Sequence, residues 1–321
     1  MIFVAVYLFS VKTIYVDENN TLQTDVSFYE LTAVFSQNVI IILLVQQKRK
    51  EIAALVSHFM ILEKMTSTIK QGELSGYIKA KKRVFVVALL EYGLTTICCI
   101  IDCSNNPPEA INTAIYFIAF GCHFNYELLL IASLVFLIAG FQELGYILAS
   151  GQLDPDEIKK VCEIHTLLKN VFILVKTSFE RIILVKTISD TFISTTGIHY
   201  QVRMILENRK ENKISKLIFI VIWGTLISVY DFGVAYFFGG VLEQDKLVSR
   251  QIDEALSRLE KTYKRNTLRR IHKHINQTDV KICGLFPINC TLIFWMGANI
   301  TTYTTYLVQF SKIGDDLFSG S

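Results

Sequence analysis

The chain has 321 residues, 51% of them hydrophobic, and its mean hydropathy is +0.39. An ordinary soluble domain is excluded, because the apolar residues gather in long runs and about 20 of them in a row span a bilayer as a helix. The net charge of +3 is too small to indicate a nucleic-acid-binding protein. The seven cysteines show no CxxC motif and no Cys/His ligand spacing, so we predict no disulfide framework, metal site or cofactor.

Seven hydrophobic segments follow one another along the chain. Backbone polar groups inside lipid must be satisfied internally, which leaves helices or a closed barrel. The runs lack the period-two alternation of barrel strands. We therefore predict an all-α, polytopic membrane protein with seven transmembrane helices. The segments cover residues 1–14, 27–45, 84–102, 111–141, 182–206, 217–242 and 282–310.

The basic residues between the segments predict the orientation of the chain. Loops 46–83, 142–181 and 242–283 hold nine, five and ten Lys and Arg residues, 24 in all, whereas the connections on the other side hold four. The positive-inside rule then places the N-terminus in the cytosol and the C-terminus outside. The sequon at Asn19 falls in a loop on the predicted outer side and is a glycosylation candidate. A G-protein-coupled receptor has the opposite orientation.

The first segment, 1–14, is shorter than a full span and has two other interpretations. It has the apolar character of a signal peptide, although no basic region precedes it. Alternatively, the chain is a shortened form of a longer receptor. The orientation of the remaining six segments is the same in each case.

Two stretches on the predicted inner side have the apolar periodicity of amphipathic helices, residues 156–175 and 249–276. The first follows Asp154 and Pro155, which suit a helix N-terminus. The apolar faces consist of Ile158, Val161, Leu168 and Val171 in the first stretch and of Ile252, Leu256, Leu259 and Tyr263 in the second. Each is interpreted either as a helix on the membrane surface or as part of a cytosolic helical bundle.

The last hydrophobic segment carries the most specific motif. Thr302 and Tyr303 are followed by five residues and then by Gln309 and Phe310. Thr302, Tyr306 and Gln309 share one helix face because they are four and three residues apart. Polar groups facing lipid are costly, so this face is expected to meet protein or water. One interpretation is that these side chains hydrogen-bond to neighbouring helices.

The motif, the seven segments and the inverted orientation resemble those of insect gustatory receptors. The resemblance implies a ligand-gated, non-selective cation channel of four subunits, identical or mixed with other gustatory receptor subunits, in the plasma membrane of a sensory neuron. It also implies a small-molecule tastant as ligand and a pore lined by the last helix. The implied pore and gate residues are Thr302, Tyr303, Tyr306, Gln309 and Phe310.

The resemblance also implies a division of the chain. The ligand-sensing helices would occupy 1–242, with cytosolic helical extensions at 46–83 and 142–175. Anchor helices, which would carry most subunit contacts, would occupy 243–281, the pore helix 282–310 and an extracellular tail 311–321.

Aromatic and ionisable residues of the outer segment halves are candidates for the ligand pocket. Such pockets are mostly apolar with a few placed polar groups. Ionisable groups deep in a membrane protein usually face an interior cavity, although Glu91, Glu127 and Asp231 could each be neutralised by a buried partner such as Lys186. The candidates are Glu91, Tyr92, Tyr116, Phe120, His123, Glu127, His199, Phe219, Trp223 and Tyr230.

No motif of an enzyme is present in the sequence, whether a nucleophile elbow, a P-loop or a zinc-binding HExxH. The alternatives are a channel subunit of the insect odorant receptor type, a G-protein-coupled receptor and a secondary transporter. A transporter would show inverted repeats, and none is visible.

Overall fold

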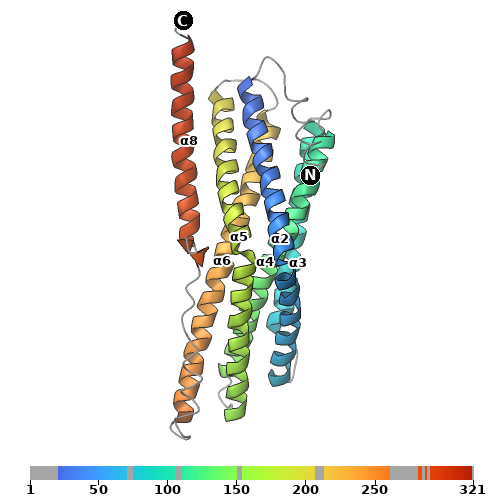
Figure 1. Ribbon diagram of the computed structural model, residues 1–321, viewed down its shortest axis with the longest axis vertical. Coiled ribbons are helices and arrows are strands. Elements are labelled where there is room, and N and C mark those ends of the chain that lie inside the picture. Colours follow the sequence, from blue (N-terminus) through green and yellow to red (C-terminus); the bar gives the residue numbers. More distant parts are fainter. Residues whose placement is uncertain are drawn as a thin grey trace.

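The computed structural model describes residues 21–70, 75–105, 110–149, 154–206, 213–260, 281–283, 286–287 and 290–319. The long helices are α2 (Thr21–Lys70), α3 (Ser75–Asn105), α4 (Ala110–Ala149), α5 (Pro155–Leu206), α6 (Lys213–Glu260) and α8 (Cys290–Ser319). They form an elongated bundle with α8 at one edge, beside α5 and α6 (Figure 1). The predicted first segment and Asn19 lie outside the described residues.

Most of the predicted inner connections are continuations of the membrane helices. Helix α5 runs unbroken for 52 residues, which is about 78 Å at 1.5 Å per residue. Helix α2 likewise continues through the charged stretch to Lys70, and α6 to Glu260. Few Pro or Gly residues interrupt these stretches, so the backbone bonding of each helix propagates beyond its apolar run.

Both predicted amphipathic helices are part of these continuations. Ile158, Val161, Leu168 and Val171 of α5 are all buried, as are Ile252 and Leu256 of α6. This burial is within the bundle and favours the cytosolic bundle over a helix lying on the membrane surface. Residues 261–276 of the second stretch lie outside the described part of the chain.

The N-terminus of α5 has the capping arrangement that its sequence predicts. The Asp154 carboxylate accepts from the backbone N–H of Glu157 at 2.7 Å. The Glu157 carboxylate accepts in return from the backbone N–H of Asp154 at 3.0 Å. These reciprocal bonds satisfy donors that a helix start leaves open, and Pro155 occupies the first position, where no N–H is needed.

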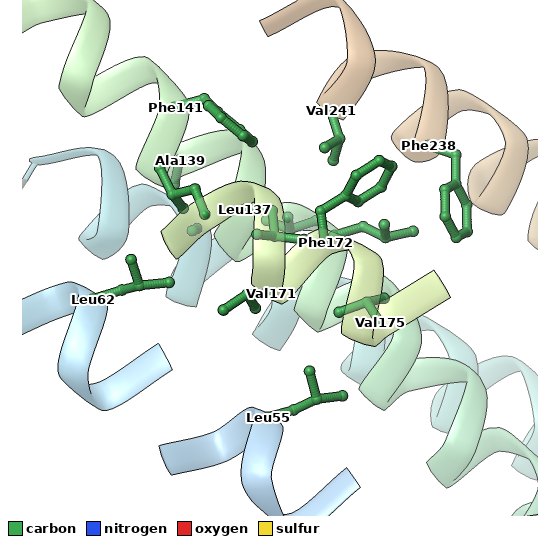
Figure 2. Packing of buried hydrophobic residues seen from close by; sticks show 14 of the residues in the cluster. Leu55, Leu62, Leu137, Ala139, Phe141, Val171, Phe172, Val175, Phe238 and Val241 are labelled. Carbon is green, nitrogen blue, oxygen red and sulfur yellow. The ribbon is translucent and has the colours of Figure 1, made fainter. Parts of the chain in front are cut away.

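The core lies around α5, which packs between α2 and α6 (Figure 2). Leu55 and Leu62 of α2 approach α5 from one side. On the other, Phe172 of α5 meets Phe238 of α6, with ring centroids 5.9 Å apart. Phe141 of α4 completes the layer and is fully buried.

The apolar run of α4 extends past the level at which its neighbours become charged. Phe136 lies in the predicted fourth membrane segment, yet its ring packs against Phe59 of α2 and Tyr77 of α3, 5.8 and 6.2 Å between centroids. Both partners belong to the predicted cytosolic extensions. By length and composition, Asn125–Ala149 is the one stretch among the described residues that qualifies as a membrane span, and 61% of its most apolar window is buried in the protein. The high hydropathy of this part of α4 therefore reflects burial in the protein core as well as contact with lipid.

The last helix begins later than the hydrophobic segment predicts. The segment was expected to start near Ile282, but Lys281–Ile282 (β1) and Phe286–Pro287 (β2) form a short antiparallel pair, with Ile282 opposite Phe286. The chain reverses at Cys283, which has a positive φ of 47°. Pro287 has no N–H to donate within a helix, and α8 starts three residues beyond it, at Cys290. The helix then continues to Ser319, through most of the predicted tail.

Candidate functional site

The C-terminal half of α8 exposes the side chains of the sequence motif. The helix is anchored to the bundle through Leu292 and Met296, both buried near its start. By contrast, Tyr303 and Tyr306 are 55% and 53% exposed, and Thr302 and Gln309 are exposed as well. The side chain of Phe310 lies outside the described set. Within one subunit, this face of α8 is therefore available to water, lipid or another subunit.

Three exposed threonines of α8 make their hydrogen bonds within the helix. The hydroxyls of Thr301, Thr302 and Thr305 each donate to the carbonyl four residues earlier, at 2.8 Å. The amide nitrogen of Asn299 donates in the same way to the carbonyl of Trp295. These donors are therefore not used to join α8 to α5 or α6, which weakens the interpretation that the motif only attaches α8 to its neighbours in the same chain.

A second candidate site is a buried charge cluster where α4, α5 and α6 meet. Lys186 of α5 lies 2.9 Å from the carboxylate of Glu127 on α4, and both residues are about 5% exposed or less. Lys186 also forms an ion pair with Asp190, one helical turn further along α5. The sequence-based suggestion that Lys186 neutralises Glu127 is thus observed.

Helix α6 contributes an aromatic face and a further carboxylate to the charge cluster. The ammonium of Lys186 lies 4.5 Å from the ring centroid of Tyr230, within cation–π range. Asp231 is partly exposed and lies close enough to interact electrostatically with Lys186. One ammonium therefore holds groups from three helices, at a point where burying any of these charges alone would be costly.

The described side chains bring only part of the predicted pocket together. Glu127 and Tyr230 meet at Lys186, while Tyr92 of α3 donates a 2.7 Å hydrogen bond to Asn125 of α4. The structure places the other candidates on helices, but their side chains lie outside the described set: Glu91, Tyr116, Phe120, His123, His199, Phe219 and Trp223.

Sequence reasoning missed Asp190 and Asn125 as members of these contacts. Asp190 was signalled by its position four residues after Lys186 in an otherwise apolar segment, a spacing that pairs opposite charges on one helix face. Asn125 carried no comparable signal, because its partner lies 33 residues away on another helix.

A polar contact nearer the inner end of the bundle is structural. The Nε2 atom of His165 lies 2.8 Å from a carboxylate oxygen of Asp245 and 3.4 Å from the Ser249 hydroxyl. A catalytic relay needs the hydroxyl and the carboxylate on different ring nitrogens, and here both approach the same one. The buried pair instead connects α5 to α6.

Comparison with known proteins identifies the family of the chain. Its sequence matches the model of the family described as 7tm chemosensory receptor over residues 1–313. Comparison with curated proteins finds no match.

The fold resembles the structure of the insect olfactory receptor OR5 from Machilis hrabei, with a TM-score of 0.67 and 12% sequence identity. That match covers 95% of this chain and 87% of the olfactory receptor. At this identity, the likeness concerns the fold, and it agrees with the predicted seven-helix architecture. Because the family model covers nearly all of its sequence, the chain belongs to the 7tm chemosensory receptor family.

Proposed function

We propose that this chain is a gustatory receptor that works as a tastant-gated, non-selective cation channel, with a pore formed by α8 of four subunits in the plasma membrane of a sensory neuron. The carrying observation is the exposed motif face of α8, where Thr302, Tyr306 and Gln309 are free of their own bundle. A polar face at this depth requires water or protein beside it. Four such faces arranged around a pore axis would contact water in the pore and protein of the neighbouring subunits. The Gln309 amide oxygens would then be directed at passing cations.

The geometry also supports a route from ligand to gate. Helices α5 and α6 contribute Lys186 and Tyr230 to the charge cluster, and the same two helices carry α8. A tastant bound among α2 to α6 would move α8 through this shared packing. It opens the channel only by binding the open state more tightly than the closed state.

The test is whole-cell current from cells that express the chain, with G-protein signalling blocked, during application of sugars, bitter compounds and amino acids. A rapid cation current that Gln309→Ala alters in gating or selectivity supports the proposal. Thr301→Ala is the matched control, because Thr301 is exposed on the same helix but is turned about 100° from Thr302. Equal currents from wild type and Gln309→Ala would show that Gln309 is not part of the gate.

A channel subunit of the odorant receptor type is the second candidate, because the fold matches an olfactory receptor. Adding volatile compounds to the same panel separates the two: currents evoked by volatile compounds alone would favour the odorant type.

A further inference from the structure

The outward face of α3 changes from basic to apolar within one helical turn. Lys79, Lys82 and Arg83 are exposed and are spaced by three and four residues, so they share a face. Val86 and Leu90 follow on that face and are 52% and 57% exposed. The opposite face carries Tyr77 and Ala80, which are buried in the bundle.

Among the residues that the structure describes, no ion pair involves Lys79, Lys82 or Arg83. Lys81 points elsewhere and forms its pair with Glu63 of α2, at 2.9 Å. Like charges at this spacing on one helix face repel one another and destabilise the helix. Binding of an anion from another molecule would relieve this repulsion.

The apolar part of the face has the dimensions of one membrane leaflet. From Val86 it continues through Leu90 to Ile97, which is also exposed. Eleven residues of helix rise about 16 Å, close to half of the roughly 30 Å hydrocarbon core. An acyl chain that lies along these residues would bring its headgroup to Lys82 and Arg83.

We infer that Lys79, Lys82 and Arg83, with Val86 and Leu90 above them, form a binding site on α3 for an anionic phospholipid of the inner leaflet. The phosphate and any further acidic group of the headgroup offset part of the charge of the three cations, and one acyl chain covers the apolar face. Arg83 offers a planar fork suited to phosphate oxygens, and the two lysines add point charges on the same side. Lipid binding at this site does not depend on whether the protein conducts ions.

The experiment uses the full chain in nanodiscs of phosphatidylcholine with a minority of phosphatidylserine. After detergent exchange, the co-purifying phosphatidylserine is counted by lipid mass spectrometry. The test variant is Lys79→Gln, Lys82→Gln and Arg83→Gln. The control variant, Lys159→Gln, Lys160→Gln and Arg258→Gln, removes the same charge from exposed positions near the inner ends of α5 and α6.

Wild type and control should retain phosphatidylserine in preference to phosphatidylcholine, and the test variant should lose this preference. Each cation near an anionic surface changes association roughly fivefold, so three changes should remove most of it. The charge-keeping variant Lys79→Arg, Lys82→Arg and Arg83→Lys should retain the lipid, which separates loss of binding from misfolding.

Three outcomes would overturn the inference. Equal retention by the test and control variants would show that overall charge, and not this face, attracts the lipid. Displacement of phosphatidylserine by millimolar inorganic phosphate would identify a phosphate site in place of a lipid site. A change in subunit assembly of the test variant in pure phosphatidylcholine would assign the basic residues to a neighbouring subunit. Because no current is measured, none of these results depends on the channel proposal.

Discussion

At the scale of single residues, Lys186 has the most demanding environment among the described side chains. It contacts Glu127 of α4, Asp190 of its own helix and the Tyr230 ring of α6 while being almost fully buried. Buried ion pairs are not always stabilising compared with apolar residues, but removing one partner leaves the other charges uncompensated. Lys186 is therefore expected to matter both for the fold and for the relative positions of three helices.

Replacing Lys186 with Met should strongly destabilise the purified protein. The expected loss is about 3–5 kcal/mol, because Glu127 and Asp190 keep their burial and lose their counter-charge. Thermal unfolding in detergent measures it, with exposed Lys159→Met as the control. The double variant Lys186→Met and Glu127→Gln should recover part of the loss. Similar melting temperatures for Lys186→Met and Lys159→Met would contradict a stabilising role for the cluster.

Cys162 of α5 illustrates how burial suppresses reactivity. Removal from water, with additional repulsion from Asp253 and Glu163, raises the pKa of its thiol from 9.0 to about 11. The reactive thiolate therefore forms only as the pH rises toward that value. At pH 8, the folded protein should alkylate at Cys162 roughly a hundredfold more slowly than the unfolded chain, on thiolate fraction alone. Peptide mass spectrometry after iodoacetamide treatment measures this, and equal rates with and without denaturant would refute it.

What the sequence could predict at this scale depends on the distance between partners. Pairs one helical turn apart, such as Lys186 with Asp190 or Asp154 with Glu157, have a spacing that the sequence contains, although neither pair was predicted. Long-range contacts such as Tyr92 with Asn125 were not, since they depend on which helices meet and at what height. Periodicity identifies the face that a helix buries, but it does not identify the residue opposite.

At the scale of elements, side chains of α3 and α5 lie close to the backbone of α4 at Gly140. A Cβ atom added there would lie 2.7 Å from Leu168 Cδ2 and 2.9 Å from the Tyr77 hydroxyl. The absence of a side chain thus allows three helices to pack together. Burial in this region also raises the pKa of the Tyr77 hydroxyl from 10.0 to about 12.

Gly140→Ala should lower stability by about 1–3 kcal/mol, because the added methyl group forces Leu168 or the backbone to move. Gly239→Ala in α6 is the matched control, since its Cβ would meet nothing within 4 Å. That variant should gain about 0.5–1 kcal/mol from the higher helix propensity of alanine. If both variants unfold at the same temperature, the close approach at Gly140 does not limit the packing.

The extent of the helices was only partly predictable. Apolar runs identified α2 to α6, and the family resemblance implied that helical extensions follow at 46–83 and 142–175. The charged stretches do extend the same helices, because residues such as Leu55 and Leu62 continue to bury one side of α2, but the apolar runs did not show where these extensions end. At α8 the predicted start was wrong, since the apolar residues before Pro287 form a strand pair.

At the scale of the whole molecule, the seven-helix family fold and the inner bundle follow from hydropathy and helical periodicity together. The orientation in the membrane remains a prediction from the 24 to 4 distribution of basic residues. It decides between this receptor type and a G-protein-coupled receptor, whose N-terminus lies outside.

An epitope placed after Ser321 should bind antibody on intact cells, whereas one inserted within 261–280 should bind only after permeabilisation. The expected difference is nearly complete, since an antibody does not cross the membrane. Surface immunofluorescence with and without detergent measures both. The reverse pattern would favour the G-protein-coupled orientation and would exclude the proposed arrangement of the pore.

The position of α4 also has a consequence for the biosynthesis of the protein. The translocon sorts segments by their hydrophobicity, and Asn125–Ala149 is apolar enough to be retained in the bilayer on that basis. In the finished receptor, much of this stretch is enclosed by other helices, among them α5 and α6, which are synthesised later. The C-terminal half of α4 is therefore expected to remain in lipid or with a chaperone until α5 and α6 have been synthesised and can cover it. Maturation of this receptor is then expected to be slow and sensitive to the supply of membrane chaperones, with the transfer of α4 as the step at which chains are lost.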